Sequence, residues 1–317
     1  MFSGFDLKIS KQFFGDKFEE YRKKGQLHLD SQKANYENEL KSYIVNGTID
    51  GSQILNEWFP MVKADIFFSH SHDDKDLTCA LAGWMNEKFN LNCFIDSNVW
   101  GWSENLLEML NEKFSDKRKN PQGGWLYDHE SCNRVSQHVN VMLSVALQKM
   151  IDKVESVILL NTNQSIRVFD AEQISSTYSP WIYTEIINTK YIQKKPLIVY
   201  RDYSSLEHGC GKRIFEENSQ IENKMKISYM VPIDHLNKLD EHLLKAWQQE
   251  YESNSERGYA FDIVYKYFYP EELNMAYFIT NNFTNQELKT IKNYYSGYSQ
   301  NEVERLEMIR NRMMDNY

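Results

Sequence analysis

The sequence predicts an α/β fold built on a five-stranded parallel sheet, with helical segments added at both ends. Three observations support this prediction. Short apolar runs rich in β-branched and aromatic residues recur between residues 65 and 231, segments with apolar residues at helical spacing separate them, and polar loops follow the runs. Strands that alternate with helices in this way form a doubly wound parallel sheet, here of the compact flavodoxin-like kind.

Five apolar runs are predicted to be the strands of this sheet. They are residues 65–69, 92–96, 156–162, 196–200 and 226–231. The helices expected between them cover residues 77–89, 104–114, 139–151 and 185–192. Residues 115–134 interrupt the alternation, and the stretch 117–124, which contains Pro and Gly, is expected to be a loop.

The two ends of the chain are predicted to be helical extensions of this domain. The N-terminal part is polar and rich in helix formers, with aromatic residues spaced like one apolar helix face, and the C-terminal part becomes helical and aromatic again. We therefore expect a helical N-terminal extension over residues 1–60, an α/β domain over 61–232 with an insertion at about 115–134, and a helical C-terminal extension over 233–317.

Composition limits the classes of partner and the compartment. The 317 residues have a formal net charge of -9 and no long Lys/Arg tract, so general binding to nucleic-acid phosphates is not expected. The first residues lack the charged-then-apolar run of a signal peptide, and no stretch approaches the ~20 apolar residues of a membrane span. The four cysteines show no CxxC pairing and are expected to be reduced thiols. We therefore expect a cytoplasmic protein without nucleic-acid or membrane partners.

A capped helix start at residues 179–185 is the segment most relevant to function. Ser179 is predicted to be the N-cap, and Pro180 would then occupy the first helical position, where its missing N–H costs nothing. Trp181 and Glu185 are four residues apart, so they lie on one helix face, an aromatic surface beside a carboxylate. Alone, this pattern is more typical of an ordinary helix start with one buried Trp and a solvated Glu.

Two further segments give this helix start a context. Residues 65–72, Asp-Ile-Phe-Phe-Ser-His-Ser-His, form a strand that ends in a serine-containing loop, and residues 94–96 form a second strand end followed by a loop with Gly101. In this order, with Trp181 and Glu185 as a Trp-x-x-x-Glu motif, the segments resemble the sequence boxes of a TIR (Toll/interleukin-1 receptor) domain of the enzymatic bacterial type. The resemblance covers roughly residues 61–232, and the insertion and both ends of the chain have no counterpart in it.

The resemblance implies an enzyme, an NAD+ glycohydrolase or cyclase with Glu185 as the catalytic residue. Such enzymes cleave the nicotinamide–ribose bond and release nicotinamide with ADP-ribose or with a cyclic or conjugated ADP-ribose. It also implies NAD+ as substrate without a further cofactor, and a setting in bacterial antiphage immunity. Homo-oligomers through the TIR domain and the helical extensions are expected, as is a separate effector protein that responds to the product.

The chemistry of NAD+ suits a single carboxylate. The nicotinamide is positively charged and already a good leaving group, so a carboxylate helps by stabilising the oxocarbenium-like ribose and by holding its hydroxyls. Ligands of open α/β sheets lie beyond the carboxyl ends of the strands. The residues expected around Glu185 on this ground are Ser69, His70, Ser71, Asp96, Trp100 and Gly101. Trp181 is expected either to stack on an adjacent ring or to anchor its helix.

Two other functions stay open on the sequence. The run from His70 to Lys75 resembles the His-x-His-x-Asp-His motif of metallo-β-lactamase-like hydrolases, and His70, His72 and Asp74 are residue types that suit zinc. Lys75 stands where that motif has its final His, so no metal is expected. The other function is that of a TIR-fold interaction module without catalysis, which would need no carboxylate at Glu185. A nucleoside deoxyribosyltransferase-like enzyme would share both the fold and the glycosidic chemistry.

Overall fold

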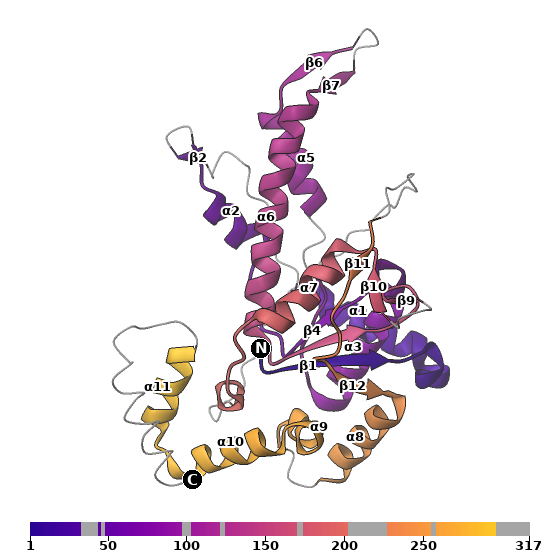
Figure 1. The fold of residues 1–317 in the computed structure, drawn as a ribbon, viewed down its shortest axis with the longest axis vertical. Coiled ribbons are helices and arrows are strands. Elements are labelled where there is room, and N and C mark those ends of the chain that lie inside the picture. Colours follow the sequence, from indigo (N-terminus) through magenta and orange to yellow (C-terminus); the bar gives the residue numbers. More distant parts are fainter. Residues whose placement is uncertain are drawn as a thin grey trace.

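The computed structural model describes residues 1–32, 44–45, 48–96, 103–120, 124–169, 174–201, 227–254 and 258–295. Its centre is a five-stranded sheet in which every strand is parallel to its neighbours, in the order β12-β1-β8-β4-β5 (Figure 1). The strands are β1 (Ser3–Lys8), β4 (Ile66–Ser69), β5 (Cys93–Phe94), β8 (Ser156–Leu160) and β12 (Asn237–Asp240). This confirms the predicted α/β class with a five-stranded parallel sheet, and the fold is consistent with a flavodoxin-like one.

Three of the five predicted strands are confirmed in the central sheet, as β4, β5 and β8; one of the other two is not a strand, and the other is a strand of a different sheet. Residues 196–200 instead form the 3₁₀ helix η4 (Leu197–Tyr200). Residues 226–231 contribute β11 (Tyr229–Met230), which pairs with β10 (Ile174–Thr177) in a small antiparallel sheet completed by β9 (Arg167–Phe169).

The two missing places in the central sheet are filled from the ends of the chain. β1 lies between β12 and β8, with Phe5 opposite Asn237 on one side and opposite Ile158 on the other. Read from its other edge, the sheet has the order β5-β4-β8-β1-β12, which corresponds to the flavodoxin-like order 2-1-3-4-5. The strand β1 is therefore the fourth strand of that arrangement. The expectation that residues 1–60 and 233–317 are purely helical extensions is therefore wrong for these strands, because both ends supply strands of the core.

Helices cover both faces of the sheet, and the alternation of side chains along the strands separates two cores. Phe68 and Ile158 belong to the core that includes α1, α3, α8 and α9, whereas Phe67 and Val157 pack with α5 and α6, and Leu159 packs with α7. On the first face lie α1 (Phe18–Gln32), α3 (Lys75–Phe89), α8 (Glu241–Ser253) and α9 (Ala260–Phe268). On the second face lie α5 (Ser103–Phe114), α6 (His129–Lys153) and α7 (Pro180–Tyr191).

Two glycines allow α1 and α3 to approach closely. A Cβ added to Gly25 of α1 would lie 1.8 Å from the carbonyl oxygen of Cys79, and one added to Gly83 of α3 would lie 2.1 Å from that of Tyr21. The backbones of the two helices are therefore in direct contact.

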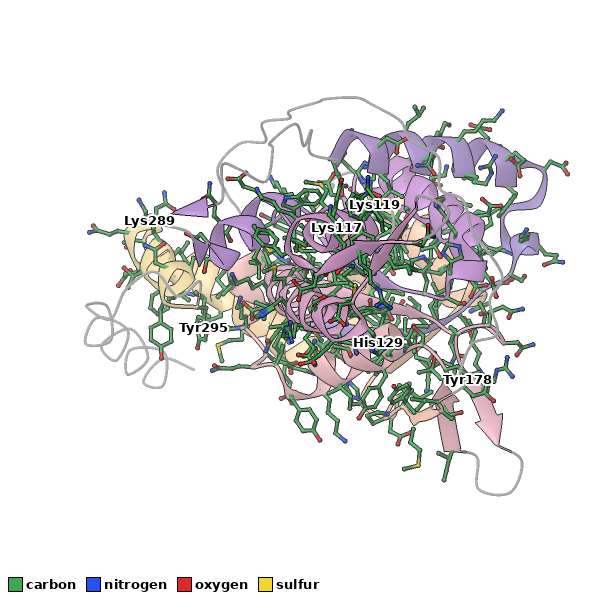
Figure 2. All side chains as sticks on the ribbon, turned by 90° about the horizontal axis from the view of Figure 1, so that it is seen from above. Lys117, Lys119, His129, Tyr178, Lys289 and Tyr295 are labelled. Atoms are coloured by element: carbon green, nitrogen blue, oxygen red, sulfur yellow. The ribbon has the colours of Figure 1, made fainter. Side chains whose placement is uncertain are left out.

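An arm made of α5 and α6 projects from the sheet and ends in a hairpin of β6 (Lys117–Lys119) and β7 (Trp125–Tyr127) (Figure 1). Figure 2 looks down this arm, so that Lys117, Lys119 and His129 lie over the body of the molecule. The prediction of a loop over residues 117–124 is wrong for residues 117–119, which form the strand β6. The helix α6 begins at His129, ten residues before the start of the predicted 139–151 helix. The side chains of both hairpin strands are exposed.

The remaining described elements flank these layers. They are η1 (Lys11–Lys17), β2 (Ile44–Val45), β3 (Thr48–Ile49), α2 (Gly51–Trp58), η3 (His72–Asp74), α10 (Pro270–Asn282) and α11 (Asn285–Tyr295). Within the described part of the chain, no helix has the length and apolar character needed to cross a bilayer.

Candidate functional site

The helix α7 begins as its sequence predicts. Ser179 is the N-cap, and its Oγ accepts a hydrogen bond of 3.2 Å from the backbone N–H of Ile182, while Pro180 is the first helical residue. This start directs Glu185, one turn further on, against the sheet, where it is only 3% exposed.

Glu185 lies beside residues from the carboxyl ends of two strands. Burial raises the pKa of its carboxyl well above the ordinary value, and the negative charge of Asp96, just after β5, raises it further. The hydroxyl of Ser69, the last residue of β4, lies beside the carboxyl and opposes the rise. The structure thus brings Glu185, Ser69 and Asp96 together, as the sequence predicts.

His70 belongs to the same cluster. Burial lowers the pKa of its imidazole, and the charges of Asp96 and Asp74 oppose that effect. Neither ring nitrogen of His70 nor the Ser69 Oγ has a hydrogen-bond partner of good geometry among the described groups, although all three atoms are buried. Buried polar atoms without partners are rare in proteins, and here they are adjacent at the end of one strand.

A hydrogen bond connects this cluster to the segment that follows β8. The Thr162 Oγ1 donates to the Asp74 Oδ2 over 2.5 Å, which joins the segment after β4 to the segment after β8. Burial raises the pKa of Asp74, and Thr162 and His70 oppose this rise. The sequence indicates Asp74 only as a metal ligand and carries no signal for Thr162, because nothing local in it shows that the two strand ends are neighbours.

The other predicted residues have different outcomes. Ser71 is half-buried at the start of η3, and its carbonyl oxygen accepts from the backbone N–H of Asp74 at 2.9 Å, a turn contact. Trp181 packs against the apolar cluster of Phe67 and Phe94, so it anchors α7 to the sheet. Trp100 and Gly101 lie outside the described residues.

The metal alternative gains no support from the arrangement of the side chains. His72, the second histidine of the proposed motif, is exposed, whereas His70 is buried. Across the described ranges, no group of three or more His, Cys, Asp or Glu side chains is arranged to hold a metal ion.

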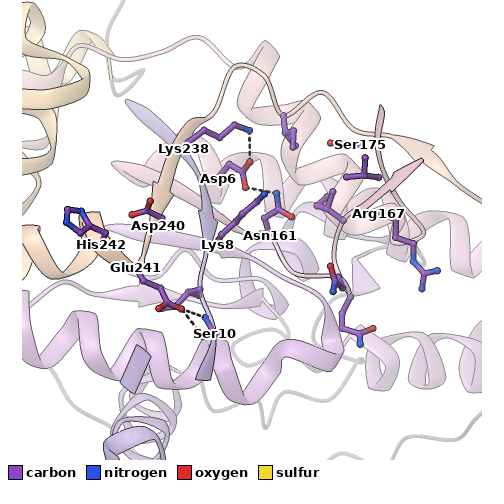
Figure 3. A pocket seen from close by; sticks show the side chains of 16 residues that line it. Asp6, Lys8, Ser10, Asn161, Arg167, Ser175, Lys238, Asp240, Glu241 and His242 are labelled. Carbon is purple, nitrogen blue, oxygen red and sulfur yellow. Dashed lines mark hydrogen bonds and ion pairs between the residues drawn. The ribbon is translucent and has the colours of Figure 1, made fainter. Parts of the chain in front are cut away.

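A cleft of about 1130 Å³ opens at the same edge of the sheet, beyond β1, β8 and β12 (Figure 3). Glu185, Ser69 and His70 do not line it. Its lining residues at the carboxyl ends of the strands are Asp6, Lys8, Asn161, Lys238 and Asp240. The sequence does not predict this cleft, because two of its three strands come from segments expected to be helical.

No family model matches this chain, and no curated protein or solved structure is similar enough to it to indicate a relationship. The geometry and chemistry of the site are therefore the basis for assigning a function.

Proposed function

We propose that this chain is a TIR-type NAD+ glycohydrolase or cyclase that cleaves the bond between nicotinamide and ribose, with Glu185 as the catalytic residue. The observation that carries the proposal is the convergence of Glu185, Ser69, His70 and Asp96 at the carboxyl end of the sheet. Ligands of open α/β sheets bind at that edge. The resemblance of three sequence segments to TIR boxes supplies the choice of NAD+ over other glycosides.

In this reaction the C1′–N bond of the nicotinamide ribose breaks, and the bonding electrons leave with nicotinamide, which becomes neutral. The Glu185 carboxylate stabilises the positive charge that develops on the ribose. Water then adds at C1′ and loses a proton, so NAD+ and water give nicotinamide, ADP-ribose and H+. When a nucleophile within the substrate takes the place of water, the product is cyclic.

The protonation state of Glu185 fits a cationic substrate. Burial and Asp96 both favour the neutral acid. A positively charged nicotinamide ribose placed beside the carboxyl would favour the ionised form, since an opposite charge within a few ångströms lowers a carboxyl pKa. Binding of NAD+ would thus favour the ionised, catalytic form of Glu185, with its proton released to solvent.

The biological role follows from the resemblance alone. In bacterial antiphage immunity the product would act as a signal to a separate effector protein, or its formation would deplete NAD+. TIR enzymes generally act as assemblies in which a neighbouring subunit helps to complete the site, so the active species would be a homo-oligomer.

The test is release of nicotinamide from NAD+ by the purified protein, followed by chromatography. We expect turnover by the wild type and a loss of roughly a hundredfold or more in Glu185→Gln, the range found when one group that stabilises developing charge is removed. Glu108→Gln is the matched control, because Glu108 is an exposed glutamate on α5, and it should retain full turnover.

Two outcomes would contradict the proposal. If Glu185→Gln turns over NAD+ as fast as the wild type, the catalytic residue is a different one. If the wild type releases no nicotinamide even at protein concentrations that favour assembly, the non-catalytic interaction module becomes the better description. The same chromatogram identifies the product as linear, cyclic or conjugated.

A further inference from the structure

The cleft beyond β1, β8 and β12 has the size and position of a ligand site. Ligand pockets typically measure about 300–1,000 Å³, and this cleft, at about 1130 Å³, is slightly larger than that range. It lies at the carboxyl ends of parallel strands, where open α/β sheets bind ligands. It is separate from the cluster around Glu185.

The buried carboxylate of Asp6 lies at the floor of this cleft. Asp6 of β1 is 1% exposed, yet its two carboxylate oxygens are held by one partner directly after β8 and one partner on β12. The Asn161 Nδ2 donates to Oδ1 over 2.8 Å, and the Lys238 Nζ pairs with Oδ2 at 2.6 Å. Burying a carboxylate is costly unless it is paired and hydrogen-bonded, so this group is fixed in place.

The other two carboxylates of the cleft are also engaged. Glu241 accepts from the backbone N–H and from the Oγ of Ser10, at 2.9 and 2.8 Å, and Asp240 accepts from the backbone N–H of Leu243 as the N-cap of α8. Lys8, in contrast, is exposed and forms no ion pair with any residue in the described ranges. Its side chain extends along the cleft toward Asp6 and Asn161 (Figure 3).

The charges and amides of the lining define the ligand chemistry. Lys8, Arg167 and Lys238 are balanced by three carboxylates, so the cleft does not favour a simple anion. Lysine ammonium groups bind phosphate, whereas carboxylates and side-chain amides accept and donate hydrogen bonds to hydroxyls. A ligand with one phosphate and several hydroxyls satisfies both sets.

We propose that this cleft is a binding site for a phosphorylated sugar, with its phosphate at Lys8 and Lys238 and its hydroxyls at Asn161, while the buried Asp6 holds Lys238 and Asn161 in position. The site does not depend on cleavage of NAD+. It nevertheless adjoins the helix that presents Glu185, because Ile166 and Ile233 of the cleft wall pack against Ile182 and Ile186 of α7.

The test is isothermal titration with ribose 5-phosphate, and with inorganic phosphate and ribose in separate arms. We expect ribose 5-phosphate to bind more tightly than either fragment, and Lys8→Gln to weaken it about tenfold, the effect of losing one charge-assisted contact. Lys8 has an exposed side chain, so this variant should fold normally. Lys149→Gln, which removes an exposed lysine of α6, is the matched control and should bind as the wild type does.

Binding should also weaken as salt is added, because an exposed ammonium is screened. The comparison of Lys8→Gln with Lys149→Gln needs no turnover of NAD+, so this result is independent of the proposed cleavage. The proposal is overturned if ribose 5-phosphate shows no binding at millimolar concentration, if it binds no more tightly than inorganic phosphate, or if Lys8→Gln binds it unchanged.

Discussion

Glu185 and His70 are both buried at the carboxyl end of the sheet, and burial moves their pKa values in opposite directions. The pKa of the carboxyl is raised and that of the imidazole is lowered, so burial favours the neutral form of each. A neutral acid and a neutral imidazole can both donate and accept hydrogen bonds. The pair is thus able to bind a polar ligand without a fixed charge of its own.

Glu185 should make folding stability depend on pH. Its pKa is higher in the folded than in the unfolded state, where a Glu titrates near about 4.3, so the folded protein holds the proton more tightly. The stabilisation from this proton is complete at lower pH and is lost as pH rises toward the folded pKa. We expect Glu185→Gln, which cannot ionise, to gain stability relative to the wild type between about pH 5 and pH 8.

Urea unfolding across this pH range measures the difference. Glu108→Gln again serves as the control, because Glu108 is an exposed glutamate of α5. A constant gap between Glu185→Gln and the wild type would mean that Glu185 is not buried in solution.

The residues of the site differ in how far the sequence could predict them. Ser69, Asp96 and Glu185 could be predicted, since each follows or begins an element with a strong local pattern. Asp6 and Asn161 could not, because their hydrogen bond joins residues 155 positions apart. An aspartate in a predicted strand is expected to be exposed to solvent, because burial of its charge requires partners that the local sequence does not show.

At the scale of elements, the contact between α1 and α3 depends on the absence of side chains at Gly25 and Gly83. We expect Gly25→Ala to lower the free energy of unfolding by about 3 kcal/mol or more, because the added methyl would meet the Cys79 backbone rather than a movable side chain. Gly83→Ala should behave alike, since its methyl would meet the backbone of Tyr21.

Chemical denaturation of these variants tests the contact. Gly258→Ala is the control, because Gly258 is exposed and a Cβ there would meet no heavy atom within 4 Å. Equal stabilities of Gly25→Ala and Gly258→Ala would show that the two helices are further apart than the structure places them.

Pairing between distant elements also explains the wrong strand assignments. Leu197–Tyr200 has the apolar, β-branched character of a buried strand, but the place beside β8 is occupied by β1, and the segment forms η4 instead. Local pattern identifies segments able to join a sheet. It does not decide which of two such segments pairs with a given strand, since that depends on contacts made across the whole chain.

At the scale of the whole molecule, a buried ionic cluster joins the C-terminal helices to the sheet. Arg201, 2% exposed, donates to the Glu155 Oε1 over 2.9 Å and also pairs with Asp262 of α9. Glu155 directly precedes β8, and its backbone oxygen accepts from the N–H of Phe2. One side chain thus connects the sheet with α9.

We expect Arg201→Met to lower the free energy of unfolding by about 3–5 kcal/mol, because it leaves two buried carboxylates without their cation. Burial already raises the pKa of Glu155 to about 7, with Arg201 opposing. Folding stability from the protonated Glu155 is present at low pH and lost as pH rises through about 7. The loss in Arg201→Met should therefore be larger at about pH 8 than at about pH 5.

Arg134→Met is the control for this experiment. Arg134 forms an exposed pair with Glu130 one turn away on α6, and exposed pairs contribute about 0–1 kcal/mol. A loss in Arg201→Met no greater than that in Arg134→Met, or one independent of pH, would contradict the role assigned to the cluster.

The arm is connected to both sites through a single strand. The 25 residues of α6 span about 37 Å at the helical rise, and only Val154 and Glu155 separate its end from β8. Beyond β8 lie Asn161, which holds Asp6 in the cleft, and Thr162, which holds Asp74 beside His70. The arm and the two sites therefore share one strand: β8 follows α6 at one end, and beyond its other end it supplies one residue to each site.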